Sequence, residues 1–352
     1  MINFDNAATT PVLETAKKAF LEAPQGNPSS SHSFGREAKA TLENCRNEIL
    51  TLLGCGKEYD LYFTSGATEA CNWAVKSICS TADQRRRSLV ASPFEHHAVT
   101  EAVAQYNVPK YTKLDHAQML VNNETGQLYD VKSLCRKGGL VACDMTAAIG
   151  HTSVNIGEIS PDYAMFGGHK FGSLKGIGAL IVKEGCPIAP MIFGGAQERG
   201  MRGGTVSVPL VSSMAAALTW RSLHMAENEK AIRAVAQELI ISLGCHHVDF
   251  DINLPDGKSS KDCAPHILSI RFPGVYGAAL AAALSERGVM VSTGSACSSG
   301  DNAASANLMA SGLTEQEALE TIRFSFDWYN TRQEAAHAAR IIADIVPALR
   351  RG

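Results

Sequence analysis

The sequence lacks the features of secreted, membrane and metal-binding proteins. Its ten cysteines include no CxxC pair, the spacing typical of zinc sites and redox motifs. The start, MINFDNAATT, has no charged residues followed by an apolar run, so it does not resemble a signal peptide. The apolar run at residues 278–284 is far shorter than the roughly 20 residues that a membrane-spanning helix needs. We therefore expect a cytoplasmic protein with reduced thiols, no metal site and no membrane partner.

The sequence also has little net charge. It contains 32 Lys and Arg against 35 Asp and Glu, a balance of −3 that argues against direct binding to nucleic acid. The one basic run that stands out, Arg85-Arg86-Arg87, predicts a solvated helix end or loop. Hydrophobic residues make up 45% and charged residues 19%, as in ordinary globular enzymes. A length of 352 residues exceeds what one small core needs and predicts two lobes.

Strand-like and helix-like segments alternate along the first part of the chain. This order predicts an α/β fold with a mostly parallel central sheet in a large domain. The segments expected to form its strands are residues 61–63, 88–92, 140–143, 163–166 and 177–182.

A helical pattern over residues 207–243 predicts the connection to a second, smaller α+β domain. Its expected strands and helices are residues 266–272, 278–287, 289–292, 322–326 and a helix from residue 332. The predicted limits are residues 15–222 for the large domain, and residues 1–14 and 223–352 for the small one.

Polar residues gather at the ends of the predicted strands. Thr68, His96, Asp144, His169 and Lys170 all lie at or just past such an end. Because ligands of open parallel sheets bind beyond the carboxyl ends of the strands, these residues predict one shared site. Each residue alone also fits a helix cap or a structural role.

The chemistry of these residues suits an anionic cofactor with a reactive carbonyl. The small residues 65–68 open a helix and would let a phosphate approach its N–H groups, although an ordinary cap has the same pattern. Lys170 follows a buried strand, where desolvation lowers a lysine pKa and gives the free amine of Schiff-base chemistry; the alternative is a surface lysine. Asp144 fits as the partner of a protonated pyridine nitrogen.

Two further residues come from the second domain. Arg323 has apolar neighbours on both sides, so it needs an anionic partner, either a substrate carboxylate or a structural ion pair. Cys297 lies among Gly, Ser and Ala in residues 292–300, a composition that predicts a mobile loop and an accessible, reactive thiol. The alternative is an incidental loop cysteine.

With these residues identified, the sequence resembles the cysteine desulfurases of the NifS/IscS type, among the fold-type I, class V aminotransferase-like enzymes that use pyridoxal 5′-phosphate (PLP). The resemblance covers nearly the whole chain, and its motifs occur in family order, which a chance match would not produce. The matching blocks are FDNAATTP (4–11), GNPSSSH (26–32), FTSGATEACN (63–72), EHHAV (95–99), NNETG (122–126), Asp144, GGHKFGSLKGIGAL (167–180), GGAQERGMRGGT (194–205), TGSACSSG (293–300) and IRFSF (322–326).

The resemblance implies a fold-type I PLP-dependent transferase and a role for each matching residue. Lys170 binds PLP covalently and moves the substrate α-proton. His96 stacks on the ring and is a catalytic residue that moves protons, and Asp144 pairs with the ring nitrogen. The cofactor phosphate is bound by Ala67, Thr68 and His169, and by Thr205 from the neighbouring subunit of a homodimer. The substrate is bound by Asn27, Asn123 and Arg323, the last on its carboxylate.

The implied reaction removes sulfur from L-cysteine. It gives L-alanine and a persulfide on Cys297, the nucleophile. The sulfur then passes to an acceptor protein for iron–sulfur cluster assembly or nucleic-acid thiolation.

Three features depart from the family pattern. Ala147 replaces the glutamine that follows the aspartate, and Gly167 replaces a serine that binds the phosphate. Losing two hydrogen bonds of about 1.5–3 kcal/mol each would weaken PLP binding, unless a neighbour such as Thr146 compensates. The stretch between His96 and Asn122 is short and lacks a strand–helix unit of the family. These departures leave three alternatives open: a weakly active or inactive scaffold, a selenocysteine lyase, or another PLP reaction such as amino transfer.

Overall fold

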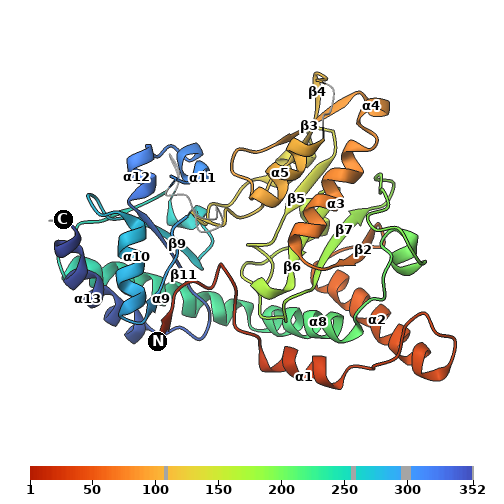
Figure 1. The fold of residues 1–352 in the computed structure, drawn as a ribbon, viewed down its shortest axis with the longest axis horizontal. Helices are drawn as coiled ribbons and strands as arrows, with labels where there is room; N and C mark the ends of the chain where they lie inside the picture. The colour runs from red at the N-terminus through yellow and green to blue at the C-terminus, as the bar shows by residue number, and fades with distance from the viewer. Residues whose placement is uncertain (107–109, 255–258, 295–302, 351–352) are drawn as a thin grey trace. The chain divides into compact units, whose positions relative to one another are not determined.

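The computed structural model describes residues 1–106, 110–254, 259–294 and 303–350 (Figure 1). It divides into two compact units. Unit 1 consists of Met1–Thr9, Val121–Leu128 and His224–Gly352, and unit 2 of Thr10–Leu120 and Tyr129–Leu223. The short segment Val121–Leu128 therefore belongs to unit 1, although the sequence patterns around it gave no sign of a change of domain.

Unit 2 is built on a six-stranded sheet. Its strand order is β2 (Tyr59–Thr64), β7 (Gly178–Lys183), β6 (Tyr163–Gly167), β5 (Val141–Asp144), β4 (Lys113–Ala117) and β3 (Arg87–Ala91). The strands from β3 to β6 are parallel, and β7 is antiparallel to both of its neighbours, β6 and β2. The predicted α/β class with a mostly parallel sheet is confirmed.

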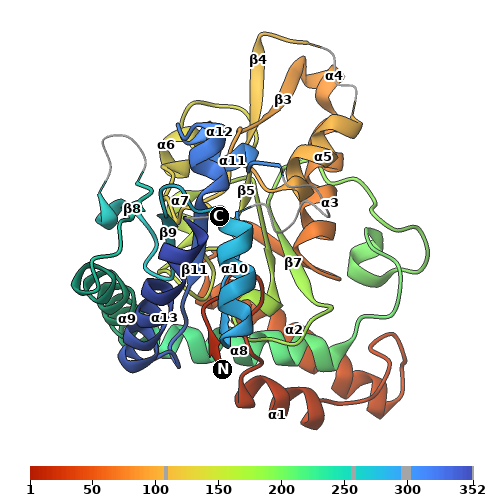
Figure 2. The same cartoon turned by 60° about the vertical axis from the view of Figure 1, so that its left-hand side comes forward.

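Helices cover the sheet of unit 2. Trp73 of α3 (Ala67–Cys79) is fully buried and meets Tyr62 of β2 edge-to-face, with ring centroids 5.3 Å apart. Burying such a large aromatic face fixes the helix on the sheet. Helices α1 (Glu14–Glu22) and α2 (Ser33–Leu52) pack against α8 (Val208–Leu223) (Figure 2). The shorter helical elements are α4 (Ala82–Arg85), α5 (His97–Gln105), α6 (Val131–Cys135), α7 (Ile156–Ile159), η1 (Gly168–Lys170) and η2 (Gln197–Gly200).

The segment between His96 and Asn122 contains both a helix, α5, and a strand, β4. Asp115 of β4 is fully buried, and its carboxylate accepts from Arg85 (2.6 Å), Arg87 (2.7 Å) and the N–H of Leu140 (2.9 Å). Arg85 ends α4, as expected for the basic triplet. The expectation of a solvated triplet is wrong for the side chains of Arg85 and Arg87, because both neutralise a buried charge.

Unit 1 combines short strands with helices, as predicted for an α+β layer. β11 (Thr321–Ser325), β9 (Ile267–Arg271) and β8 (Asp251–Ile252) form an antiparallel sheet, and β1 (Ile2–Asn3) pairs in parallel with β10 (Val289–Met290). Its helical elements are α9 (Met225–Cys245), η3 (Ser260–Asp262), α10 (Gly277–Glu286), α11 (Ala306–Ala310), α12 (Glu315–Leu319) and α13 (Arg332–Leu349).

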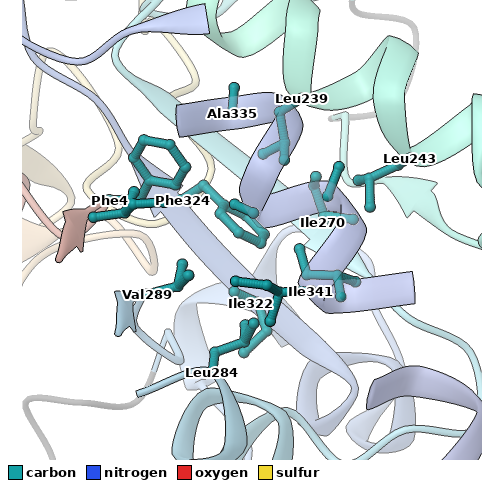
Figure 3. Close-up of a cluster of buried hydrophobic side chains, with 14 of the residues drawn as sticks. Phe4, Leu239, Leu243, Ile270, Leu284, Val289, Ile322, Phe324, Ala335 and Ile341 are labelled. Carbon is teal, nitrogen blue, oxygen red and sulfur yellow. The ribbon is translucent and has the colours of Figure 1, made fainter. Parts of the chain in front are cut away.

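The core of unit 1 draws on both ends of the chain. Phe4 is fully buried, and its ring lies 5.0 Å from that of Phe326 in an edge-to-face pair. Figure 3 shows Phe4 near Phe324, with Leu239 and Ile270 in the same cluster. Within the described residues, no helix is both long and apolar enough to cross a bilayer.

Candidate active site

The carboxyl ends of four strands of unit 2 carry most of the predicted site residues. β3, β5 and β6 run the same way, and β2 does too, because both β2 and β6 are antiparallel to β7. Thr68 follows β2, His96 follows β3, Asp144 ends β5, and Lys170 follows β6. All four therefore lie along one edge of one sheet, where parallel sheets bind their ligands.

The start of α3 is held against the neighbouring strands by glycines. A Cβ at Gly178 would lie 2.6 Å from the backbone carbon of Gly66, so no other residue fits there without a shift. A Cβ at Gly167 would lie 3.3 Å from both the N and the Cβ of Ala67, which is closer than ordinary contact. The serine of the family pattern thus has little room at position 167. The helix N-terminus that remains accessible, at Ala67 and Thr68, presents backbone N–H groups suited to a phosphate.

Glu69 lies in the first turn of α3 and connects it to the segment before α8. Its carboxylate accepts from the Ser65 N–H (2.7 Å) and from Arg202 through Nε (2.9 Å) and Nη2 (3.2 Å). Burial would raise the pKa of Glu69, but the hydrogen bonds from Arg202 and Ser65 outweigh it and lower this pKa. Arg202 therefore neutralises an acidic group at the start of α3. Sequence reasoning missed this pair, although Arg202 stands in the quoted block at residues 194–205.

Lys170 is fixed through its backbone. Its carbonyl oxygen accepts from Thr10 Oγ1 (2.8 Å) and lies 2.8 Å from His151 Nε2. The pKa of the neighbouring His169 is lowered to about 4, mainly by burial and to a smaller extent by the positive charges of Lys170 and Lys175. His169 is therefore a neutral hydrogen-bonding group at pH 7.

His96 begins α5 and is held as one tautomer. Its Nδ1 accepts from the N–H of Ala98 (3.1 Å), so the ring proton is assigned to Nε2. Burial lowers the pKa of His96; the charge of Asp144 opposes this effect, and the charges of Lys170 and His97 add to it. The ring is therefore neutral at pH 7 and has an N–H to donate.

Asp144 is buried at the end of β5, close to the position of one departure from the family pattern. One carboxylate oxygen accepts from the Thr146 N–H (2.8 Å), and the other lies 3.9 Å from the thiol of Cys71. Ala147 offers no side-chain hydrogen bond. The Thr146 hydroxyl oxygen, by contrast, is buried and has no hydrogen-bond partner among the described residues. A donor is thus available two residues after Asp144.

Taken together, these residues of unit 2 fit PLP. The glycine-lined start of α3 suits its phosphate, Asp144 its ring nitrogen and Lys170 its aldehyde carbon. The unpartnered Thr146 hydroxyl is a polar group that a bound molecule would satisfy.

Two of the predicted substrate residues meet in unit 1. Arg323 donates from Nη1 to the carbonyl oxygen of Asn123 (2.9 Å) and from Nη2 to Asp5 (2.9 Å). Arg323 therefore forms the structural ion pair that the sequence left open as the alternative to binding a substrate carboxylate. Its Nε is nevertheless buried without a hydrogen-bond partner in the described part of the chain, as is Oδ1 of Asn123. The pair therefore keeps one donor and one acceptor for a ligand.

The remaining predicted residues are not gathered in this way. Asn27 is exposed in the turn before α2, where its side-chain oxygen accepts from the Ser29 N–H (2.9 Å). Thr205 is exposed just before α8. Cys297 lies outside the described residues. The nine other cysteines are free thiols, four of them buried.

Comparison with known proteins places the chain in a family. The aminotransferase class-V family model matches residues 2–120 and 112–337. A cysteine desulfurase of Frankia sp. is 33% identical over 99% of this chain and 92% of its own length. The chain belongs to the cysteine desulfurases of the class-V aminotransferase family. The cysteine desulfurase IscS of Dictyoglomus turgidum is 30% identical over 99% of this chain and 95% of that protein.

Solved structures of NifS-like proteins share the fold. A NifS-like protein has a TM-score of 0.89 and 29% identity, covering 99% of this chain and 100% of that one. Alignment with the Dictyoglomus desulfurase runs over 380 positions, so it contains gaps opposite this 352-residue chain. The two family matches overlap at residues 112–120, within the segment expected to be short. Enzymes of this family depend on PLP, in agreement with the fit of the residues above.

Proposed function

We propose that this chain is a PLP-dependent cysteine desulfurase, which takes sulfur from L-cysteine, releases L-alanine and holds the sulfur as a persulfide on Cys297. The observation that supports this most is the placement of Lys170, Asp144 and His96 at one sheet edge, beside the glycine-lined start of α3. Family membership supports the removal of sulfur from cysteine as the reaction, because the relatives above are named cysteine desulfurases.

Each residue has a task that its surroundings support. PLP, when bound, acts as an electron sink that stabilises negative charge at the substrate Cα. Asp144, fixed by the Thr146 N–H, keeps a proton on the ring nitrogen. Lys170 holds the cofactor and moves the Cα proton at its Nζ. His96 is neutral and has its proton on Nε2, so it can stack on the ring and donate one hydrogen bond.

The sulfur transfer balances without an added oxidant. The Cys297 thiolate attacks the substrate sulfur and forms the S–S bond while the substrate C–S bond breaks. The electron pair of that bond stays on the substrate carbon, which takes up a proton, so the organic product is alanine. Substrate cysteine and the enzyme thiol together supply all the atoms of alanine and the persulfide.

The same proposal covers the oligomeric state, the substrate-binding residues and the sulfur acceptor. Thr205 is exposed beside a segment that includes the exposed Phe193 (83%) and Ile192 (41%), and this supports a homodimer in which Thr205 reaches the partner's phosphate site. Asn27, Asn123 and Arg323 would bind the substrate. An acceptor protein would receive the sulfur for iron–sulfur cluster assembly or nucleic-acid thiolation. A cytoplasmic location stays a prediction from the sequence.

The test is to mix the purified, PLP-loaded protein with L-cysteine and measure alanine and the mass of Cys297. Wild type should be yellow, release alanine and gain one sulfur on Cys297. Lys170→Ala should lose the colour, whereas Lys132→Ala, a control on an exposed lysine of α6, should keep it. Cys297→Ala should keep the colour and lose alanine formation, whereas Cys245→Ala, at an exposed cysteine, should not. Sulfide release by Cys297→Ala at the wild-type rate would overturn the proposal.

A further inference from the structure

Glu124 and Glu95 are buried carboxyls that take no part in the reaction proposed above. Glu124 in unit 1 is 7% exposed and accepts a hydrogen bond from the hydroxyl of Ser305 (2.6 Å), the residue that caps α11. Glu95 in unit 2 is equally buried, but its Oε2 has no hydrogen-bond partner among the described residues. Because Glu95 directly precedes His96, which is expected on the cofactor ring, its surroundings bear on the site.

Glu95 takes the place of a strand in the sheet of unit 2. Just past β4, the N–H of Leu120 donates to the carbonyl oxygen of Asp144 (2.9 Å), on the side of β5. Since successive N–H groups of an extended chain point to opposite sides, the N–H of Met119 faces the side of β3. β3 has already ended at Ala91, and the Met119 N–H donates instead to Oε1 of Glu95.

This contact connects the two residues that are expected to hold the cofactor ring. On one side, Glu95 is joined to His96 by a peptide bond. On the other side, Met119 is joined to Leu120, which is hydrogen-bonded to the backbone of Asp144. The path from His96 to Asp144 thus consists of two peptide bonds and two hydrogen bonds, one of which is made by the Glu95 carboxyl.

The groups around Glu95 favour its protonated form. Burial, followed by the charge of Asp144, raises the pKa of Glu95 well above its ordinary value, and the hydrogen bond from the Met119 N–H acts in the opposite direction. Beside it lie the buried thiols of Cys71 on α3 and Cys143 on β5, whose pKa values are also raised, first by burial. A thiol does not neutralise a carboxylate. A proton on Glu95 leaves the negative charge at this place to Asp144, the partner proposed for the ring nitrogen.

We propose that Glu95 is a positioning residue for the cofactor, because its carboxyl binds the Met119 N–H in place of β3 and thereby sets the distance between His96 and Asp144. The inference rests on the proposed function, which puts these two residues on the face and at the nitrogen of the ring. Glu95 acts as a hydrogen-bond acceptor, without a charge of its own. A neutral side chain with the same acceptor should therefore replace it.

The test follows the bound cofactor in the PLP-loaded protein. It measures the visible circular dichroism per bound PLP, which reports how the ring is held, and the rate at which PLP is lost on dialysis. Glu95→Gln keeps an acceptor for the Met119 N–H, whereas Glu95→Leu, which is similar in size, has none. The matched control is Asp162→Leu, because Asp162 Oδ2 accepts from the N–H of Val141 (2.8 Å) at the opposite end of β5.

Glu95→Leu should lower the dichroism per bound PLP and speed the loss of PLP about tenfold, as for groups that orient the ligands of a bound metal. Glu95→Gln should match wild type in both measurements. Asp162→Leu should lower the free energy of unfolding in urea, as Glu95→Leu does, and leave both cofactor measurements unchanged. If Glu95→Leu does not fold, Glu95→Asp, whose carboxyl is shorter by one CH₂ group, should show the same two changes to a smaller degree.

The proposal is overturned if Glu95→Leu, or Glu95→Asp in its place, holds PLP as wild type does. It is also overturned if Glu95→Gln behaves like Glu95→Leu, because the acceptor would then not be the group that acts. Equal changes in Asp162→Leu would overturn it as well, since a purely structural role predicts them.

These measurements need no turnover of cysteine, so they are separate from the desulfurase test. If wild type binds PLP and makes no alanine while Glu95→Leu loses PLP faster, the proposed reaction fails and the positioning role stands. If wild type makes alanine and Glu95→Leu holds PLP as wild type does, the reverse is true.

Discussion

Replacing Glu124 by glutamine should change how the stability of the protein depends on pH. A carboxyl whose pKa is raised from its ordinary 4.5 to about 7 keeps its proton to higher pH in the folded state than in the unfolded state. The folded protein therefore binds more protons between these two values, and its free energy of unfolding falls as the pH rises through this window. Glutamine keeps the shape and the acceptor for Ser305 but cannot ionise, so the variant avoids this loss.

The size of the effect follows from the shift. At about 1.4 kcal/mol per pKa unit, a rise from 4.5 to about 7 corresponds to about 3 kcal/mol. Relative to wild type, Glu124→Gln should therefore gain about 3 kcal/mol in free energy of unfolding between pH 4.5 and pH 8, with most of the gain complete by pH 7.

Urea unfolding of the PLP-loaded proteins at pH 5, 6, 7 and 8, followed by circular dichroism, measures this difference. Glu315→Gln is the matched control, and its difference from wild type should stay constant. A Glu124→Gln difference that is constant with pH, or that falls as the pH rises, would refute the reasoning, because it would mean that burial does not oppose the charge of Glu124.

Three further changes have expected outcomes. Gly178→Ala should push the start of α3 away and weaken PLP binding about tenfold or more in a PLP titration followed by absorbance, whereas Gly244→Ala, with open space around it, should not. Asp115→Ala should lower the free energy of unfolding by about 3–5 kcal/mol in a urea titration, because two arginines lose a buried partner; a loss no larger than that of the exposed Asp249→Ala would contradict this. Thr146→Val should speed the loss of PLP on dialysis, and an unchanged rate would show that the hydroxyl makes no contact with the cofactor.

The parts of the fold that could be predicted are those in which neighbouring residues carry the signal. The apolar runs of β2, β3, β5, β6 and β7 stand out against their polar flanks. Asp144 ends one of these strands, and Lys170 lies just past the end of another. Because the carboxyl ends of parallel strands lie at the same edge of a sheet, the location of Asp144 and Lys170 follows from the sequence without knowledge of the helices.

β4 was missed because its sequence, KLDHA, is mostly polar. The buried Asp115 is tolerated there only because Arg85 and Arg87, about thirty residues earlier, neutralise it. A strand whose polar residue is compensated from elsewhere has no apolar pattern of its own.

The contacts of Glu124 and Arg323 show a second limit of prediction from sequence, since their partners lie far away along the chain. Ser305 is 181 residues from Glu124, and Asp5 is 318 residues from Arg323. Nothing in the local sequence distinguishes an arginine that awaits a substrate from one with a distant aspartate, and Arg323 has features of both. Such pairs are set by tertiary packing, which one sequence does not reveal.

The pairing of β1 with β10 also constrains how the chain can fold as it is made. At synthesis rates of about 5–20 residues per second, Val289 emerges roughly 15–60 s after its partner Ile2. During that time Phe4, which ends fully buried in unit 1, has no partner strand beside it. Unit 2 draws all its residues from before His224, so it can complete its sheet while unit 1 still waits for the end of the chain. The residues of β1 are thus translated long before β10, the strand with which they pair.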